Sequence, residues 1–519
     1  MYNIKKDNFL SVSNFSPMMN KILFFTDGWF FNFGIAKQLQ NYNDFKLYAI
    51  FDVDDKAKKF FQHQKIVKYE KFWYFMDFIK KTNSSPDLEY LKTFEQKYNI
   101  NLWRIIYADR EFYNQYNNYY KFHYDEILSI VEQECKFFEM VIEEIRPQFL
   151  SIFMTVSHYH ELLASICKAK GIHILMLGSA RFGNRMMISQ EGGILDKDTL
   201  TMNVQTTRSL NELNNYLKRF DSAKEGADYR RISFEENAWQ RYKPLINFFF
   251  SKRSKNFVNR YYNFGRTRKK VLWIKLSNFF KKKYRNHFIN KNFKTEINDK
   301  DNIIYFPLQM EPERVLLIGA PYYTNQISVI TSIAKSLPVN YKLYVKEHPV
   351  MKILGWRNTS YYKQILDYPN VVLIHPSISS EKILEKSSLI ITIAGTAGQE
   401  AAFHGKPVIT LTEQLYSYLP SVYKPKTIEE LPEAIRKMLQ YKINSSSLNE
   451  YVNLVDENTF ELNLIDISAD FAYRFGFKGL IMDAEMPISK VESFLNDYED
   501  IFKKLVNEYL IKIKRTMKE

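Results

Sequence analysis

Short apolar runs that fit buried strands alternate along this chain with stretches whose apolar spacing fits helices. The pattern opens with a strand at 21–26 (KILFFT), a helix-like stretch at 33–42 and a second strand at 46–53. Parallel strands need a long crossover, which is usually a helix. The alternation therefore predicts an open parallel sheet with helices on its faces, and it constrains the fold more than any single motif does.

The alternation occurs in two blocks. The first continues with a long helix over 122–146, a strand at 148–155 and a helix closed by Gly171. The second block has predicted strands at 303–306, 342–347, 371–374, 388–394 and 408–411, with helices between them. Two such blocks predict an α/β protein with two Rossmann-like domains, in which ligands bind outside the carboxyl ends of the strands.

Residues 206–300 interrupt this alternation because they are polar, basic and aromatic, with few clear strand signals. We predict a mostly helical, basic insertion there, between a first Rossmann-like domain over 1–205 and a second over 301–430. The remaining residues, 431–519, are predicted to form a helical C-terminal tail. The last stretch of that tail, 491–513, is strongly amphipathic.

Charge and composition narrow the classes of partner and compartment. The net charge of +15 favours anionic partners, namely nucleotide sugars, acidic glycans, anionic lipid or nucleic acid. The two cysteines, Cys135 and Cys167, form no CxxC pair, which fits a reducing compartment. Neither a signal peptide nor an apolar stretch of about 20 residues is visible. We therefore expect a cytoplasmic protein, either soluble or peripheral on the inner face of the cell membrane.

The strongest local motif is IITIAGTAGQEAAFHGKPVITL, residues 390–411. A predicted strand ends at Gly395 and a helix begins at once, with Thr396 placed to cap it and Gln399 completing a capping-box pattern. The N–H groups at such a helix start favour a phosphate, and Glu400 can accept from ribose hydroxyls. The alternative is that Thr396 only caps the helix and Glu400 only favours its first turn.

A second strand, KLYVKEHP, delivers His348 and Pro349 to the same edge of the predicted sheet. Pro349 prevents the strand from continuing. His348 can donate a hydrogen bond to a phosphate oxygen and stabilise charge that grows on a leaving nucleotide. A structural or merely solvated histidine is the alternative.

The loop FPLQMEPER, residues 306–314, follows the first strand of the second block. Its polar side chains Gln309, Glu311 and Arg314 are candidates to hold a nucleotide base or sugar. The alternative is a glutamate–arginine pair that only braces the loop.

In their order along the chain these three motifs resemble the capsule polysaccharide biosynthesis family, which groups with bacterial Kdo transferases and polysialyltransferases that carry an HP motif and a later Ser/Thr motif. The resemblance implies the two-Rossmann glycosyltransferase fold called GT-B, with the donor phosphate bound by His348 and Thr396. It also implies an inverting, metal-independent transferase without a cofactor. Such an enzyme moves a sugar, for example an acidic sugar from a CMP donor, to a surface polysaccharide or its lipid-linked acceptor.

Inverting transfer needs a general base for the acceptor hydroxyl. In the resembled enzymes this base is an Asp or Glu of the first domain, and Asp27, after the first strand, is the best-placed carboxylate here. Thr26 replaces one residue of the family's acidic pair, so Glu161 stays a second candidate, and Asp27 can also simply form the turn. Arg181, after a later strand, can meet an acidic sugar or serve the structure.

The segment 252–285 is basic and rich in aromatic residues. Its part VLWIKLSNFFKKKYR can form an amphipathic helix on an anionic membrane, which would suit a lipid-linked acceptor. An acidic glycan, nucleic acid or a plain solvated helix face are the other interpretations.

Two other functions stay open beside the transferase. A non-hydrolysing nucleotide-sugar epimerase would also have two Rossmann domains, and a non-catalytic protein could bind a membrane or nucleic acid through 252–285. No RRM or helix-turn-helix motif is visible, so nucleic acid is not an expected partner.

Overall fold

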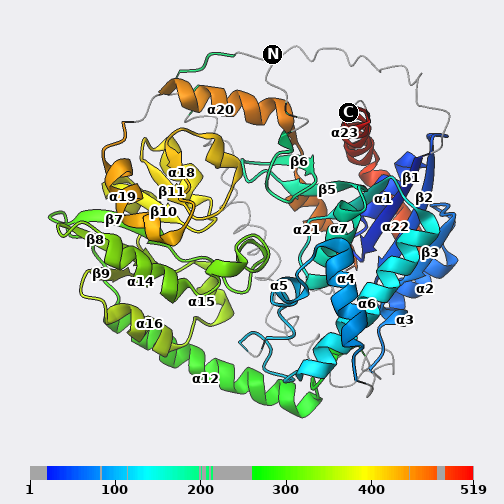
Figure 1. Ribbon diagram of the computed structural model, residues 1–519, viewed down its shortest axis with the longest axis horizontal. Helices are drawn as coiled ribbons and strands as arrows, with labels where there is room; N and C mark the ends of the chain where they lie inside the picture. The colour runs from blue at the N-terminus through cyan, green and yellow to red at the C-terminus, as the bar shows by residue number, and fades with distance from the viewer. Residues whose placement is uncertain are drawn as a thin grey trace.

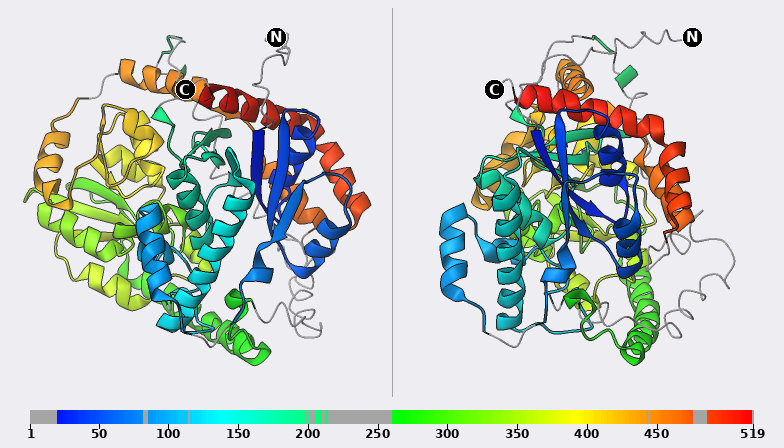
Figure 2. Two further views of the ribbon diagram at one scale, coloured as in Figure 1. Left: turned by 45° about the vertical axis from the view of Figure 1, so that its right-hand side comes forward. Right: turned by 90° about the vertical axis from the view of Figure 1, so that its right-hand side faces the viewer.

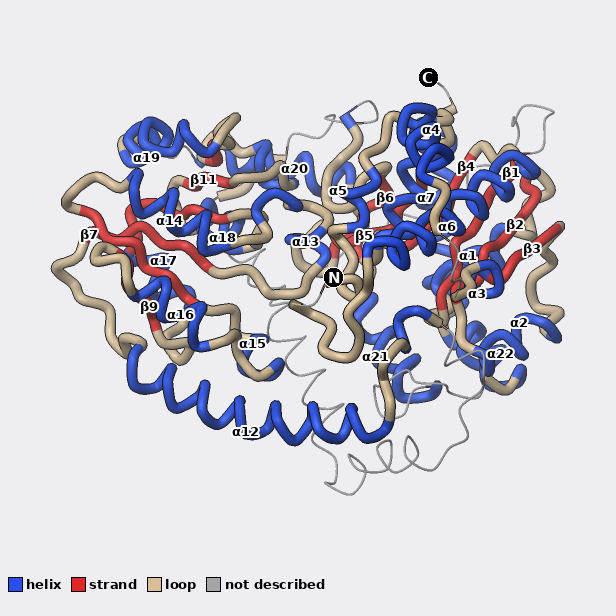
Figure 3. The backbone as a smooth tube through the Cα atoms, turned by 60° about the horizontal axis from the view of Figure 1, so that its bottom comes forward, coloured by secondary structure: helices blue, strands red, loops and turns tan. Residues whose placement is uncertain are grey.

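Two β-sheets organise the computed structural model, and they lie side by side with helices packed around each (Figures 1 and 3). Each sheet separates two clusters of buried apolar side chains, so each has a core on both faces. The structure describes residues 20–81, 85–113, 115–197, 200, 206–209, 212–213, 260–442, 445–475 and 486–517.

The first sheet has the strand order β13-β6-β5-β4-β1-β2-β3. Its strands β1 to β5 are parallel, and β6 pairs antiparallel with both β5 and β13. The bounds are β1 (Asn20–Asp27), β2 (Phe45–Asp52), β3 (Lys71–Tyr74), β4 (Phe149–Phe153), β5 (His173–Ser179), β6 (Arg185–Ser189) and β13 (Phe460–Glu461). The central strands are buried on both faces, which is why they appear in the sequence as continuous apolar runs.

The second sheet has the order β12-β11-β10-β7-β8-β9, and all its strands are parallel. The bounds are β7 (Asn302–Pro307), β8 (Tyr341–Lys346), β9 (Val371–Ile374), β10 (Ser387–Thr392), β11 (Val408–Thr410) and β12 (Val422–Tyr423). Counted in chain order within the domain, this is the 3-2-1-4-5-6 order of a doubly wound Rossmann sheet. The predicted fold class, two Rossmann-like domains of the GT-B type, is confirmed.

In each sheet the strand order reverses at the first strand, which makes this strand the topological switch point. In the first sheet β1 lies between β2 and β4, and in the second β7 lies between β8 and β10. The loops that follow the two neighbours diverge to opposite faces at such a point, which opens a crevice at the carboxyl ends of the strands. In the first sheet the predicted site residue Asp27 ends β1. In the second sheet the predicted loops follow β7, β8 and β10.

Helices cover the faces of both sheets. In the first domain they are α1 (Phe31–Leu39), α2 (Asp55–His63), α3 (Phe75–Phe78), α4 (Leu88–Tyr98), α5 (Leu102–Ile106), α6 (Tyr124–Ile145) and α7 (His158–Ala169). In the second domain they are α13 (Arg314–Leu317), α14 (Gln326–Ser336), α15 (Val350–Leu354), α16 (Thr359–Leu366), α17 (Ser380–Lys386), α18 (Ala397–Phe403) and α19 (Leu431–Leu439).

The C-terminal segment returns to the first domain. α20 (Ser445–Asn458) leads from the second domain to β13, and α21 (Leu464–Phe475), α22 (Ile488–Asp497) and α23 (Glu499–Thr516) then pack beside the first sheet (Figure 2). The amphipathic segment 491–513 is helical apart from Tyr498, where the chain leaves helical geometry between α22 and α23. The predicted helical tail therefore supplies part of the first core.

The helix α12 (Arg268–Asn292) spans both domains along one margin of the molecule (Figures 1 and 3). Near its start Lys270 Nζ donates to the Tyr119 carbonyl at 2.6 Å, and near its end Arg285 Nη1 donates to the Gly355 carbonyl at 3.1 Å. Most of the predicted insertion at 206–300, including the first part of the basic segment at 252–259, lies outside the described residues. Among the described helices none is long and apolar enough to cross a bilayer.

Candidate functional site

The carboxyl edges of the two sheets face each other across the molecule. Arg314, after β7, donates from Nε to the carbonyl of Thr155, after β4, at 2.6 Å. Arg181, after β5, donates from Nη1 to the carbonyl of Ala394, after β10, at 3.3 Å. Each contact joins strand-end loops of different domains, so loops of both domains meet at this boundary, which we call the cleft because a cavity lies along it.

Gln309 links two of the predicted loops of the second domain. Its Nε2 donates to Thr392 Oγ1 at 3.3 Å, and the same hydroxyl accepts from the Gly395 amide at 3.0 Å. A Cβ at Gly395 would lie only 2.9 Å from Gln309 Nε2 and 3.0 Å from Thr392 Oγ1. A side chain at this position would therefore push the Gln309 amide or the Thr392 hydroxyl aside.

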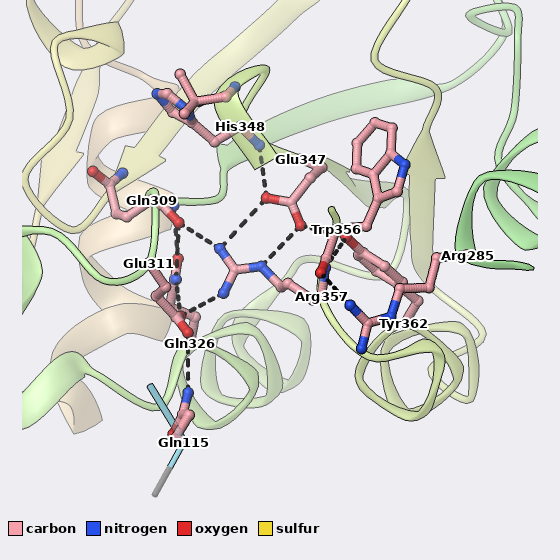
Figure 4. Close-up of polar contacts among 11 residues, drawn as sticks. Gln115, Arg285, Gln309, Glu311, Gln326, Glu347, His348, Trp356, Arg357 and Tyr362 are labelled. Carbon is pink, nitrogen blue, oxygen red and sulfur yellow. Dashed lines mark hydrogen bonds and ion pairs between the residues drawn. The ribbon is translucent and has the colours of Figure 1, made fainter. Parts of the chain in front are cut away.

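A buried arginine, Arg357, connects the Gln309 loop to the strand end that carries the HP motif (Figure 4). Its guanidinium binds Glu347 at 2.8 Å, Glu311 at 2.5 Å and the Gln309 carbonyl at 2.5 Å. Tyr362 donates from its hydroxyl to Glu347 at 2.7 Å. Burial alone would lower the pKa of Arg357, but Glu347 and Glu311 outweigh it and raise the pKa.

The network around Glu311 extends to the first domain. Gln326 donates from Nε2 to Glu311 at 2.5 Å and to the Gln309 carbonyl at 3.1 Å, and it accepts from the Gln309 amide at 2.7 Å. Gln115 of the first domain donates to the other Glu311 oxygen at 3.2 Å. Glu311 thus braces the loop through Arg357 and Gln326. Arg314, three residues later, does not pair with Glu311 in these contacts but donates to Thr155 of the first domain.

His348 follows this network directly. Its amide donates to Glu347 Oε1 at 2.8 Å, and its Nδ1 accepts from the Val350 amide at 3.3 Å. A neutral ring in this arrangement carries its proton on Nε2. His348 is half-buried, and the exposed Pro349 precedes the first turn of α15. The Arg357 network therefore holds the backbone amide of His348 through Glu347, and the Val350 amide holds one ring nitrogen.

The predicted capping box at Thr396 is wrong. Thr396 has helical backbone angles, φ −61° and ψ −20°, so its hydroxyl does not cap α18, and it lies 3.4 Å from Glu400 Oε1 instead. Gln399 donates to the Arg181 carbonyl at 3.2 Å and accepts from the Tyr451 hydroxyl at 3.1 Å. Thr396 and Glu400 are both exposed at the edge of the second sheet.

Asp27 ends β1 on the cleft side of the first sheet and is half-buried. Because Phe24 pairs with Ser151 in the parallel register, Asp27 lies level with the end of β4, next to the loop that contacts Arg314. Its Oδ1 accepts from the Trp29 amide at 3.0 Å, so it also forms the turn. Burial raises the pKa of Asp27 to about 6, and the charge of Asp52 adds to this.

The second candidate base, Glu161, lies in α7 on the same edge. Burial raises the pKa of its carboxyl, and the charge of Arg314 works against this. Three residues earlier, His158 is fully buried between Asp109 at 2.5 Å and Glu134 at 2.7 Å. Burial would lower the pKa of His158, but the two carboxylates raise it to about 10, which indicates a structural ion triad.

A cavity of about 540 Å³ lies between the domains, beside the Arg357 network. Gln115, Glu311 and Gln326 line it together with six aromatic residues, Trp103, Tyr107, Tyr113, Tyr116, Tyr322 and Tyr361. Flat aromatic faces beside hydrogen-bonding side chains suit a sugar ring, which has both C–H and hydroxyl groups.

Several of these residues have no recognisable signal in the sequence. Arg357 and Gln326 are single polar residues without a motif, and only the folded loops show that they hold the predicted Gln309 and Glu311 in place. Trp103 and Tyr322 are separated by more than two hundred positions and meet only because the two domains face each other.

Residues 194–451, about half of the chain, match the model of the family described as capsule polysaccharide biosynthesis protein. A search of the curated proteins gives no match. Among solved structures, the chain is similar to the β-Kdo 2,7-transferase KpsC of Thermosulfurimonas dismutans, with 14% identity, a TM-score of 0.29, and 66% of this chain and 88% of that one covered. It is also similar to the UDP-GlcNAc 2-epimerase of Neisseria meningitidis, with 14% identity, a TM-score of 0.25, and 83% and 94% covered.

Proposed function

We propose, from the premise that residues 194–451 belong to the capsule polysaccharide biosynthesis family, that this chain is a GT-B glycosyltransferase that builds a surface polysaccharide. The observation that carries the proposal is that two strand ends are linked to Gln309 at the switch point of the second sheet. Thr392, before the Gly395 loop, contacts Gln309 directly, and Glu347, before the HP motif, is joined to it through Arg357. Ligands of doubly wound sheets bind at this point.

We assign the donor to the second domain. His348 would donate from Nε2 to a phosphate oxygen of the nucleotide sugar and so stabilise the charge that develops as the nucleotide leaves. Gly395 and Thr396 would lie along the same phosphate, while Gln309 and Glu400 lie nearest to the nucleoside. The donor is a nucleotide sugar, and an acidic sugar on CMP fits the net charge of +15.

We assign the acceptor to the first domain and the cleft. The acceptor hydroxyl attacks the anomeric carbon, the bond from this carbon to the phosphate oxygen breaks, and the electron pair leaves with the nucleotide. Asp27 would take the hydroxyl proton, since a pKa of about 6 leaves it ionised near neutral pH and still basic enough to accept. Attack from the face opposite the leaving nucleotide inverts the anomeric centre, and no step in this scheme uses a metal or a cofactor.

The aromatic cavity is the proposed subsite for the polysaccharide acceptor. Trp103→Ala should raise the acceptor KM about fivefold, because stacking on one aromatic face is worth roughly 1 kcal/mol. Nucleotide affinity should not change. Tyr473→Ala removes an exposed aromatic residue outside the cavity and serves as the matched control.

The transferase proposal is tested with the full chain and a panel of CMP, UDP, GDP and their sugars. Binding of the correct nucleotide raises the melting temperature, and transfer releases free nucleotide only when acceptor is present. His348→Ala should lower the rate about 10²–10³-fold, whereas His375→Ala, after the neighbouring strand β9, should leave it unchanged. Interconversion of a nucleotide sugar without acceptor would support an epimerase instead.

A further inference from the structure

The helix α12 has an unusual charge composition. Its 25 residues, RKKVLWIKLSNFFKKKYRNHFINKN, contain nine lysines and arginines and no aspartate or glutamate. The whole chain has a net charge of +15, so this one helix carries a large share of the excess. A surface that complements it must be anionic.

One face of α12 belongs to the protein. Val271 and Ile289 are buried, and Ile289 joins the core of the second domain. Arg285 donates to the carbonyls of Gly355 and Trp356, directly before Arg357 in the loop. These contacts fix which side of the helix faces outward.

The outward face has a second apolar stripe. It consists of six exposed side chains, Leu272, Trp273, Leu276, Phe279, Phe280 and Tyr284. Their spacing, i, i+4, i+7, i+8 and i+12 from Leu272 with Trp273 beside it, places them within roughly 140° of one another around the helix. Trp273 is 72% exposed and Phe280 is 66% exposed, so these large side chains are not needed to fill the core.

Lys275 and Lys281 border this exposed stripe, and Lys283 lies within it, over the Phe279 ring at 4.7 Å. Aromatic side chains favour the headgroup region of a bilayer, and flanking lysines can extend from there to lipid phosphates. A nucleic-acid site would also be basic, but an aliphatic and aromatic stripe of this width has no partner on a phosphate backbone.

We propose that the outward face of α12 docks the protein on an anionic lipid bilayer. The stripe enters the headgroup region and the lysines contact the lipid charges. Since Arg285 joins α12 to the loop that carries Arg357, docking would hold the cleft at a fixed distance from the membrane surface. The inference does not depend on the proposed reaction, because binding to lipid needs neither donor nor acceptor.

The test is co-sedimentation of the full chain with vesicles of phosphatidylglycerol and phosphatidylethanolamine, compared with phosphatidylcholine alone. We expect binding to the anionic vesicles that weakens as salt rises. The triple variant Lys281→Glu, Lys282→Glu, Lys283→Glu should lose affinity on the order of 100-fold. Trp273→Ser with Phe280→Ser should also release the protein, although its charge is unchanged.

Matched variants control for charge and apolarity. Lys59→Glu, Lys65→Glu, Lys68→Glu makes the same charge change on another exposed surface, and Leu88→Ser removes an apolar side chain that is 52% exposed. Both should bind vesicles like the wild type. Equal loss in the controls, unchanged binding in the α12 variants, or binding of duplex DNA but not of vesicles would each overturn the proposal.

Discussion

The proposed role of Asp27 depends on how its surroundings shift the pKa of its carboxyl. A base must be ionised to accept a proton, and burial raises the pKa of Asp27 to about 6. The rate should therefore rise with pH through about 6 and level off above about 7. Asp27→Asn should abolish turnover at every pH and leave nucleotide binding intact. Initial rates of nucleotide release across this pH range check both statements.

The pKa of Asp27 also makes the free energy of unfolding depend on pH. A folded-state pKa above the ordinary value of 3.8 means that folding favours the protonated form. Raising the pH from about 4 through 6 therefore destabilises the wild type through this group, by at most about 3 kcal/mol. Asp27→Asn should raise the melting temperature at pH 7 and lose that advantage below about pH 4. If Asp27→Asn keeps its turnover, Glu161 becomes the candidate base.

Arg357 is the residue on which the arrangement of the donor loops depends. Arg357→Ala leaves Glu311 and Glu347 buried without their cation, so the free energy of unfolding should fall by about 3–5 kcal/mol. Urea unfolding measures the loss. Arg436→Ala, at an exposed position on α19, should change stability by less than about 0.5 kcal/mol. A similar loss in both variants would contradict the role assigned to Arg357.

Among the elements, the sequence predicts the central strands well because both their faces are buried, and the predicted run 303–306 coincides with the buried part of β7. The edge strand β3 is not predicted because it is largely exposed, and β6 is not predicted because its apolar run is only three residues long, between Arg185 and Ser189. The HP and Gly395 loops are found from local patterns. Arg357 cannot be found from a local pattern, because its partners come from distant loops. The predicted cap at Thr396 is wrong because the folded structure gives this residue helical backbone angles.

The contact between α1 and α23 can be tested with one small substitution. Gly34 lies in α1, and a Cβ there would come within 2.2 Å of the Phe502 ring in α23. Gly→Ala normally stabilises a helix, but here overpacking should destabilise the protein by about 1–3 kcal/mol. Adding Phe502→Leu should recover part of this loss, because it removes the ring atoms in the way. Chemical denaturation of the single and double variants measures the coupling.

Recovery would show that the C-terminal helices are part of the first domain. A tail that only leans on the surface would tolerate Gly34→Ala with no loss and would show no coupling with Phe502. The structure supports this prediction, because β13 and α21 to α23 share one apolar cluster with β1 and α1, although more than four hundred residues separate the two groups.

At the scale of the whole molecule, the proposed reaction needs the two domains to close on each other, because Asp27 and His348 come from different sheets. Arg181 and Arg314 hold them together with hydrogen bonds to carbonyls across the cleft. Polar contacts of this kind allow domains to move. The double variant Arg181→Ala, Arg314→Ala should therefore open the cleft without melting either sheet.

Small-angle X-ray scattering measures this opening directly. A compact chain of this length has a radius of gyration of about 24 Å, and we expect the double variant to exceed the wild-type value while its circular dichroism is unchanged. Nucleotide affinity should hold, since the donor loops belong to one domain, whereas the rate of transfer should fall because acceptor and donor meet less often in reactive geometry. An unchanged radius with an unchanged rate would mean that other contacts close the cleft and that these two arginines are dispensable. A loss of nucleotide affinity equal to the loss of rate would instead place Arg181 or Arg314 on the donor itself.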